Sequence, residues 1–383
     1  MVSRDLPSRH YFDWAASAIP DPAAAEASLY GNPSSMHLEG RQAREALEEA
    51  RSRCAAAMGV DPGTLYFTSG ATESNILVLH STLLRKGSGR LLGSEGEHPS
   101  VRENLRMLER MGKQIGSIPL TPEGAVGAEG LRGTLEKFPD ARLAAVMAVN
   151  NETGAVNDPA VLRELRRTAG SSIHFHCDMV QAIGKIPLDM AEWAPDSASF
   201  SAHKLGGPRG IGLLYLRKPL EPLFAGGGQE RGFRPGTENT AGALAMACCL
   251  ETRCRPGTVR DGYAAARARW KRLIAALRAM DGCSLIPAGR GEEDRRFSPY
   301  ILQAAFDGIP GEVMVRALDE AGFAVSTGSA CSSAGKDRPV LRAMGIGPKT
   351  SLEGIRISQG WSTTEGEIDL LAGAIRNALR SLR

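Results

Sequence analysis

Lys204 is the residue of this sequence that is best placed to act as a reactive amine. It lies in a short polar turn, residues 199–208, between two apolar stretches. Ser201 and His203 precede it and a Gly-Gly-Pro bend follows, a composition that suits neither a helix interior nor a solvated run of charges. We interpret Lys204 as a candidate for a covalent imine with a carbonyl group, whereas an ordinary lysine at a turn is a surface residue.

Cys331 carries the second reactive group. It lies in residues 326–335, a run made almost wholly of small side chains with no apolar bulk to bury a thiol. The sequence therefore predicts an exposed thiol and a candidate nucleophile. Other cysteines occur in apolar surroundings and are expected to be buried, as small hydrophobic residues usually are: Cys54, Cys177, Cys248 and Cys249.

An anion site is predicted where a strand ending at Thr68 meets a helix that opens at residues 69–73. Free backbone N–H groups and the helix dipole favour a phosphate at such a helix start, and the Ser and Thr hydroxyls add donors. An ordinary N-cap without a ligand is the alternative.

Polar residues also follow other predicted strands. Asp178 ends an apolar strand at the edge where ligands bind in open α/β sheets, so it could face a protonated ring nitrogen or could cap the next helix. His98 precedes Pro99 at a helix start and could lie flat against an aromatic ligand. Asn150 and Asn151 could donate to a ring hydroxyl or a carboxylate, although asparagine-rich turns are common.

Residues 226–239 form the longest glycine-rich polar stretch of the chain. Glycine-rich chains are usually connectors, but this one interleaves hydroxyl, amide and arginine groups with its glycines. The composition favours a phosphate contact or a subunit contact.

Short strands alternate with helices, which predicts an α/β protein whose helices cover a mostly parallel sheet. Apolar and β-branched runs indicate strands at residues 64–68, 90–93, 114–119, 143–149, 173–177, 198–200 and 211–216. Amphipathic or otherwise helical patterns indicate helices at residues 35–58, 69–79, 101–111, 159–168 and 240–254.

A change of composition at residues 255–257 predicts a domain boundary near residue 255. Beyond it the elements expected are a helix at 262–280, a strand at 300–305, a helix at 311–321, a strand at 354–358 and a helix at 365–382. We assign residues 20–255 to a large domain, and residues 1–19 together with 256–383 to a small α+β domain that carries Cys331 and Arg356.

The composition argues against several classes of protein. The 46 basic and 43 acidic residues nearly balance, at a net charge of +3, which gives no indication of a nucleic-acid or membrane surface. No apolar run approaches the roughly 20 residues that span a bilayer, so we expect a cytoplasmic protein. The seven cysteines form no Cys-x-x-Cys pair, and we expect free thiols and no structural metal.

Taken together, these segments resemble the cysteine desulfurases, the pyridoxal-phosphate enzymes of the class-V aminotransferase group. The resemblance covers nearly the whole chain, and its motifs stand in the family's order: residues 11–13, 31–35, 68–73, 97–99, 149–152, 178–181, 201–204, 226–237, 328–331 and 355–358. It implies the fold-type-I architecture, with a seven-stranded, mostly parallel sheet. One segment departs from the family pattern, because Trp14 stands where the family usually has asparagine.

The resemblance also implies roles for individual residues. Lys204 would bind the cofactor covalently and move the substrate's α-proton, with Asp178 on the ring nitrogen, Gln181 on the ring hydroxyl and His98 stacked on the ring. The phosphate would be held by Ala71, Thr72, Ser201 and His203, together with Thr237 of a partner subunit, which implies a homodimer. Asn151 and Arg356 would bind the substrate carboxylate, Arg356 through a bidentate pair.

The activity that the resemblance implies is removal of sulfur from L-cysteine. Alanine would be released, and a persulfide on Cys331 would pass to a sulfur-acceptor protein for iron–sulfur cluster or thio-cofactor assembly. A selenocysteine lyase is the nearest alternative. An aminotransferase or another β-lyase would leave Cys331 incidental, and a catalytically silent scaffold would only bind a sulfur-relay partner.

Overall fold

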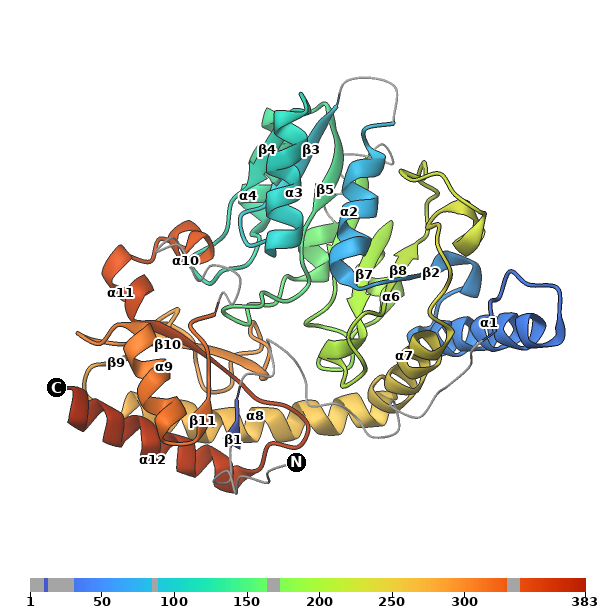
Figure 1. The fold of residues 1–383 in the computed structure, drawn as a ribbon. Coiled ribbons are helices and arrows are strands. Elements are labelled where there is room, and N and C mark those ends of the chain that lie inside the picture. Colours follow the sequence, from blue (N-terminus) through green and yellow to red (C-terminus); the bar gives the residue numbers. More distant parts are fainter. Residues whose placement is uncertain (1–9, 13–30, 85–88, 164–172, 329–337) are drawn as a thin grey trace.

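The computed structural model describes residues 10–12, 31–84, 89–163, 173–328 and 338–383. These ranges form a large sheet with helices on it and a smaller group of helices and strands beside it (Figure 1). Two segments singled out in the sequence, the one around Trp14 and the one that contains Cys331, lie outside the described residues.

The large sheet has seven strands in the order β2-β8-β7-β6-β5-β3-β4. Only β8 among them runs antiparallel to its neighbours, so the predicted mostly parallel sheet is confirmed. The strands are β2 (Leu65–Thr68), β3 (Arg90–Ser94), β4 (Ile115–Ile118), β5 (Ala141–Ala145), β6 (His174–Asp178), β7 (Ser197–Ser201) and β8 (Gly212–Leu216). Because six strands point the same way, their carboxyl ends meet along one edge.

Helices cover this sheet and pack on each other. The α1 helix buries Ala43, Leu47 and Cys54 on one face, as its spacing of apolar residues predicts, and packs against α7. Gly59 ends α1 with φ of 66°, a left-handed conformation that glycine adopts without strain. The helices here are α1 (Leu38–Met58), α2 (Ala71–Ser81), α3 (Pro99–Arg110), α4 (Ala128–Lys137), α6 (Met190–Trp193) and α7 (Thr240–Arg253), with short 3-10 turns η2 (Pro62–Thr64), η4 (Ala202–Lys204) and η5 (Gln229–Gly232).

The second group of elements surrounds a three-stranded antiparallel sheet in the order β12-β10-β9. Phe12 packs into its core beside Trp270, and the short strand β1 pairs with β11, so residues 10–12 lie with the C-terminal part of the chain. The elements are β1 (His10–Tyr11), α8 (Pro256–Arg278), β9 (Cys283–Ile286), β10 (Ile301–Phe306), α9 (Gly311–Glu320), β11 (Phe323–Ala324), α10 (Pro339–Ala343), α11 (Pro348–Glu353), β12 (Gly354–Ser358) and α12 (Glu365–Leu382).

Some element boundaries differ from those that the sequence pattern indicates. The α8 helix begins at Pro256, six residues before the expected start at 262, because proline fits the first turn of a helix, where its missing N–H is not needed. The strand expected at 143–149 is assigned as β5, which ends at Ala145. Beyond it, the backbone N–H groups of Val146 and Ala148 still donate to carbonyls of β6, so the chain stays beside the sheet.

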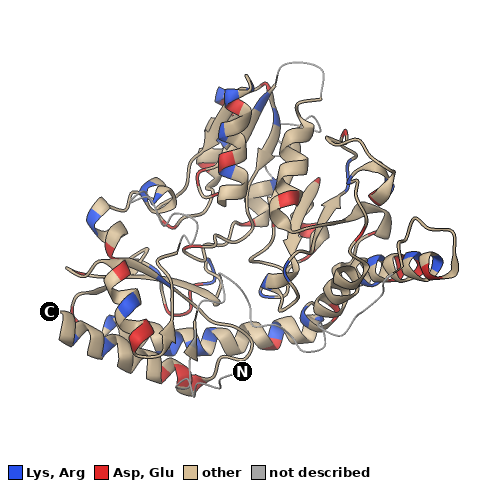
Figure 2. Cartoon of the chain, in the orientation of Figure 1, with Lys and Arg blue, Asp and Glu red and all other residues tan. Residues whose placement is uncertain are grey.

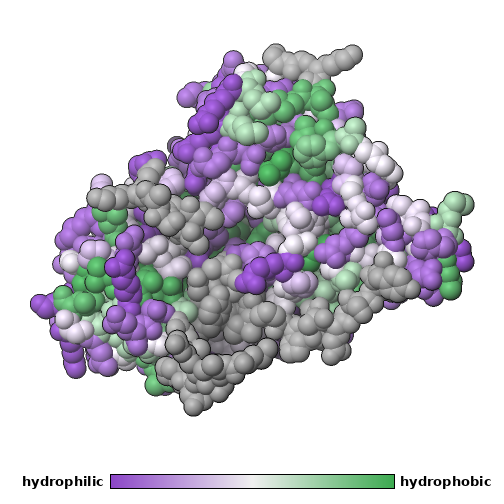
Figure 3. Space-filling model, viewed as in Figure 1, coloured by the Kyte–Doolittle hydropathy of each residue, from purple (hydrophilic) through white to green (hydrophobic). Residues whose placement is uncertain are grey.

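The surface is mixed in charge and polarity. Figure 2 shows basic and acidic residues interspersed along the helices rather than gathered by sign. The face in Figure 3 is largely hydrophilic, with a hydrophobic patch over the region of α2 and α3. Exposed apolar side chains of that region include Leu84, Met107 and Met111. None of the helices in the described ranges combines the length and the apolar character that a membrane crossing requires.

Candidate active site

A cavity of about 590 Å³ lies at the carboxyl edge of the large sheet. Segments that follow β2, β3, β5, β6 and β7 line one side of it, and Gly328 and Arg356 reach it from the second group of elements. Of the predicted site residues, the following line this cavity: Ala71, Thr72, His98, Asn151, Asp178, Gln181, Ser201, His203, Lys204 and Arg356. Thr237 does not line it, and Cys331 lies outside the described residues.

The start of α2 forms one end of the cavity and has the features of an anion site. Gly70 precedes the helix with φ of 154°, a conformation that side-chain-bearing residues rarely adopt, and it offers no side-chain cap to the first N–H groups. Ser201 and His203 line the same cavity from the end of β7 and the turn after it. The arrangement supplies backbone N–H groups, a hydroxyl and an imidazole to one anionic group.

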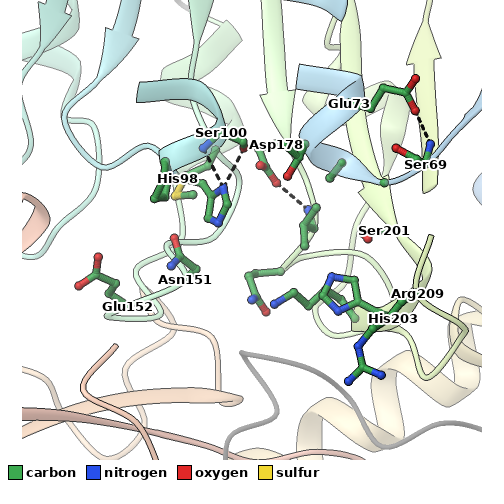
Figure 4. A pocket seen from close by; sticks show the side chains of 18 of the residues that line it. Ser69, Glu73, His98, Ser100, Asn151, Glu152, Asp178, Ser201, His203 and Arg209 are labelled. Carbon is green, nitrogen blue, oxygen red and sulfur yellow. Dashed lines mark hydrogen bonds between the residues drawn. The ribbon is translucent and has the colours of Figure 1, made fainter. Parts of the chain in front are cut away.

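Glu73 is the one acidic residue in the first turn of α2, and its charge is neutralised. Arg234 donates to its carboxylate at 2.9 Å and the Ser69 N–H donates to the other oxygen (Figure 4). Burial alone would raise the pKa of Glu73, but these hydrogen bonds outweigh it and lower the pKa. The negative charge beside the predicted phosphate site is therefore held in an ion pair that faces the glycine-rich segment.

Asp178 also lines the cavity, where it is buried at the end of β6. One carboxylate oxygen accepts from the Val180 N–H at 3.1 Å and the other from the amide nitrogen of Asn75 at 3.0 Å. These donors orient the carboxylate and compensate part of its lost hydration. A buried carboxylate that lines a cavity is chemically suited to a cationic N–H group.

Asn75 connects Asp178 to a chain of buried polar groups that the sequence did not single out. Its amide nitrogen also donates to the Ser100 hydroxyl at 2.8 Å, so the amide oxygen is the atom that accepts from His176 Nε2 at 2.8 Å. The Nδ1 atom of His176 lies 2.8 Å from the Ser197 hydroxyl. Both hydrogens of the Asn75 amide are thus committed, which fixes its orientation.

The pH dependence of stability should report the burial of His176. Burial, with a smaller effect of His174, lowers the pKa of His176 to about 3 from an ordinary value of 6.5. Between pH 6.5 and pH 3 the imidazole takes up a proton only in the unfolded chain. The contribution of His176 to the free energy of unfolding is therefore fully present above pH 6.5, and it falls by up to about 1.4 kcal/mol per pH unit below that value. Urea unfolding of a His176→Gln variant should show a weaker dependence between pH 6.5 and 4.5 than the wild type. Equal slopes in the variant and the wild type would contradict the assignment.

His98 follows β3 as the residue that caps α3, and its protonation state follows from its contacts. Its Nδ1 atom accepts from the Ser100 N–H at 3.2 Å and lies 2.8 Å from the Ser100 hydroxyl (Figure 4). Burial is the main effect on the pKa of His98; it outweighs the carboxylate of Asp178, which acts in the opposite direction, and lowers the pKa. The ring is therefore neutral near pH 7 and carries its proton on Nε2.

Lys204 ends the η4 turn after β7 and lines the cavity with His203. Burial, and then the neighbouring charge of Lys204, lower the pKa of His203 to about 4. His203 is therefore neutral near pH 7 and can donate or accept a hydrogen bond. Arg209 is exposed and lies beside His203 at the rim of the site (Figure 4).

The two asparagines after β5 have different roles. Asn150 is buried, and its amide oxygen accepts from the N–H groups of Glu152 and Thr153, both at 2.9 Å. It holds the turn together and does not line the cavity, unlike Asn151. The expectation that both amides serve a ligand is therefore wrong for Asn150, because the turn uses its side chain to satisfy backbone groups.

Arg356 enters the cavity from β12 and joins the two parts of the molecule. One terminal nitrogen donates to the Asn151 carbonyl at 2.9 Å and to the Gly328 carbonyl at 2.7 Å. A buried guanidinium whose position is set by backbone oxygens is suited to binding a carboxylate. Gly328, three residues before Cys331, lies at the same place.

Besides the pair of Arg234 with Glu73 at the cavity, the glycine-rich segment has a second contact with its own protomer. A buried ion pair links Arg51 to Glu230 through two contacts of 2.8 Å, and Glu230 also accepts from the Phe67 N–H at 2.8 Å. This pair fixes the start of the segment against β2. Thr237, farther along the segment, is exposed.

Most of the described cysteines are buried or half-buried, and burial raises the pKa of several of their thiols. Cys54, Cys177 and Cys249 are buried as expected, and burial raises the pKa of the Cys54 and Cys177 thiols. Burial likewise raises the pKa to about 12 for Cys254 and Cys283. The expectation of burial is wrong for Cys248, which is half-buried where the Arg53 guanidinium reaches its sulfur at 3.4 Å.

Several residues in or behind the cavity wall are not indicated by the sequence patterns described above. Asn75 lies four residues after Ala71 and Lys185 four residues after Gln181, so helical spacing from a predicted ligand residue could have indicated both. Ser100 and Met147 had no such signal, since the contacts that bring them to the site come from other elements.

The chain is similar to known proteins over nearly its whole length. The chain matches the family model described as aminotransferase class-V over residues 10–371. It is similar to the cysteine desulfurase IscS of Aeromonas hydrophila, at 38% identity over 97% of this chain and 93% of that protein. A solved NifS-like protein is similar at a TM-score of 0.87 and 32% identity, over 97% of this chain and 100% of the other. A structure described as SspA in complex with cysteine is similar at a TM-score of 0.75 and 27% identity, over 91% of this chain and 98% of the other.

Proposed function

The chain belongs to the class-V aminotransferase family, within its cysteine desulfurases, and on this premise we propose that it removes the sulfur of L-cysteine with the help of pyridoxal phosphate. The observation that carries the proposal is the cavity that unites Lys204, Asp178 and His98 with Arg356. An amine, a buried acid and a carboxylate-binding guanidinium in one cavity are the groups that amino-acid chemistry on this cofactor requires.

The residues present fit pyridoxal phosphate. The start of α2, with Ser201 and the neutral His203, suits its phosphate, and Asp178 suits its ring nitrogen. Lys204 lines the cavity with both sets of groups, so one ligand can meet all of them. Gln181 and His98 would complete the site at the ring hydroxyl and the ring face.

When bound, the cofactor supplies an electron sink for the bonds of the substrate's α-carbon. The protein's own residues bind, orient and move protons around it. Arg356 and Asn151 hold the substrate carboxylate, Lys204 moves the α-proton, and His98 keeps a proton on Nε2. Asn75 and the Val180 N–H both donate to the Asp178 carboxylate and hold it in place.

The sulfur transfer itself belongs to Cys331. Its thiolate attacks the substrate sulfur, so that a new S–S bond forms while the substrate's Cβ–S bond breaks. The electron pair of the broken bond stays on carbon, which takes up a proton and leaves as alanine, and the transferred sulfur remains on Cys331 as a persulfide. Cys331 is three residues from Gly328, which lines the cavity, and three residues span at most about 11 Å.

The remaining proposals concern the surroundings of the reaction. A homodimer would bring Thr237 of one subunit to the phosphate of the other, which fits its exposed position outside its own cavity. The persulfide would pass to a sulfur-acceptor protein in the cytoplasm for iron–sulfur cluster or thio-cofactor assembly. Gly328 and Arg338 stand on either side of Cys331 in the sequence and are held by contacts to Arg356 and Glu152. Such anchors suit a thiol that must both enter and leave the site.

The test of the proposed function is the stoichiometry of the products. Purified protein loaded with pyridoxal phosphate should convert L-cysteine, in the presence of a reducing thiol, into equal amounts of alanine and sulfide. Formation of a keto acid in place of alanine would contradict the proposal and favour an aminotransferase. Selenocysteine turned over in strong preference to cysteine would favour a lyase.

Asp178 should control cofactor affinity. An Asp178→Asn variant loses the charge that holds the ring nitrogen protonated, and a charge-assisted hydrogen bond contributes about 1.5–3 kcal/mol. We expect the dissociation constant of pyridoxal phosphate to rise roughly 10- to 100-fold, measured by absorbance titration of the apoprotein. The matched control is the exposed Asp189, whose replacement by asparagine keeps its capping role and should leave the affinity unchanged. An unchanged affinity in Asp178→Asn would remove Asp178 from the site.

A further inference from the structure

Lys185 is a buried lysine behind the wall of the cavity. Its side chain is 4% exposed, and its ammonium group donates to the Gln181 amide oxygen at 2.7 Å. The chain between the two residues turns sharply, since Lys185 N–H donates to the Ala182 carbonyl. In the part of the chain that the structure describes, no carboxylate lies within ion-pair distance of Lys185.

The contact determines how the Gln181 amide is oriented. A lysine ammonium can only donate, so the atom that it contacts must be the amide oxygen. The amide nitrogen of Gln181 then lies on the other branch of the amide group, as a donor. Gln181 lines the cavity, whereas Lys185 does not, so Lys185 can act on a ligand only through Gln181.

The electrostatic environment makes the charged form of Lys185 energetically unfavourable. Burial lowers the pKa of Lys185 to about 7, and the positive charges of Lys204 and Arg356 act in the same direction. His203, the other titratable group coupled to it, is neutral near pH 7. An apolar side chain of the same length would fill this space without that cost, so packing alone does not account for the amine.

We propose that Lys185 is a positioning residue for the cofactor, because it fixes Gln181 with its N–H groups directed to an anionic oxygen in the cavity, such as the ring hydroxyl oxygen of pyridoxal phosphate. The proposal rests on the proposed function and deepens it. Lys185, which lies outside the cavity lining, would keep the neutral Gln181 amide from rotating. Polarisation of the amide by the ammonium group also strengthens the N–H donor on its far side.

A double-mutant cycle on cofactor affinity tests the proposal. Lys185→Met removes the donor and keeps the length of the side chain, and Gln181→Leu removes the amide and nearly keeps its volume. We expect each single variant to raise the dissociation constant of pyridoxal phosphate about 3- to 30-fold, the effect of one hydrogen bond. Because Lys185 acts only through Gln181, the double variant should bind no more weakly than Gln181→Leu alone.

Thermal unfolding of the apoproteins provides a second readout. Gln181→Leu leaves the buried ammonium group without its acceptor and should lower the melting temperature, and adding Lys185→Met should recover much of that loss. Lys185→Gln retains a neutral donor and should bind the cofactor more tightly than Lys185→Met. Lys113→Met is the matched control, since Lys113 also donates to one acceptor, the Thr82 carbonyl, at 2.7 Å and lies outside the cavity lining.

The outcomes separate this inference from the proposed function. Additive effects of the two substitutions, or wild-type cofactor affinity in Lys185→Met, would overturn the positioning role and leave the desulfurase proposal intact. Failure of the wild-type protein to bind pyridoxal phosphate would overturn both. Cofactor binding is measured without turnover, so the result does not depend on the activity.

Discussion

Replacing Lys204 by alanine should abolish the conversion of L-cysteine, with a decrease in rate of about 10⁴-fold or more. The amine has two tasks, the covalent attachment of the cofactor and the movement of the α-proton, and alanine can do neither. Among the described residues that line the cavity, Lys204 is the only lysine, so no other amine there can replace it. The measurement is alanine and sulfide formation under saturating cysteine and cofactor.

A chemical readout accompanies the kinetic one. Borohydride reduction of the loaded wild type should fix one cofactor molecule on the peptide that contains Lys204, seen by mass spectrometry, and the Lys204→Ala protein should show none. Lys349→Ala is the control, because this exposed lysine pairs with Asp307 on the surface. A fixed cofactor on another lysine, or full activity without Lys204, would refute the assignment of the reactive amine.

Replacing Cys331 by alanine should separate cofactor binding from sulfur transfer. Without the thiol, the substrate sulfur has no acceptor on the protein, so we expect sulfide and persulfide formation to fall at least about 100-fold. Cofactor affinity should stay at the wild-type value, because other residues supply the groups that would hold the cofactor. Persulfide is measured by alkylation and mass spectrometry of the peptide that contains Cys331.

The controls for this prediction are the other thiols. Cys248→Ala and Cys283→Ala should retain activity, because neither residue lines the cavity and burial raises the pKa of Cys283 to about 12. Unchanged formation of alanine and sulfide in Cys331→Ala would refute the role of this cysteine as the sulfur acceptor, and formation of pyruvate and sulfide in place of alanine would support a β-lyase in which it is incidental. Loss of cofactor binding together with activity would instead indicate a structural defect.

Local sequence patterns indicated several residues of the cavity lining, because these residues follow strands. Asp178, His98 and Lys204 each stand just after an apolar run, and parallel strands bring such positions to one edge of a sheet. The strand pattern of the large sheet was likewise readable, since most of its strands contain a short apolar or β-branched run. Boundaries were less certain, as the earlier start of α8 shows, because a proline can either end or begin a helix.

The sequence by itself determined the chemical groups of this protein and the order in which the chain supplies them: imidazole, acid, amine, thiol and guanidinium. Only the tertiary structure decided which polar groups are spent inside the fold and which reach the cavity. Asn150 and Asn151 are neighbours in sequence, yet one satisfies a turn and the other faces the site. Lys185 and Asn75 are recognised only by their hydrogen bonds to Gln181 and Asp178. A buried polar group needs a hydrogen-bond partner, and the folded structure, not a local sequence pattern, determines which residue that partner is.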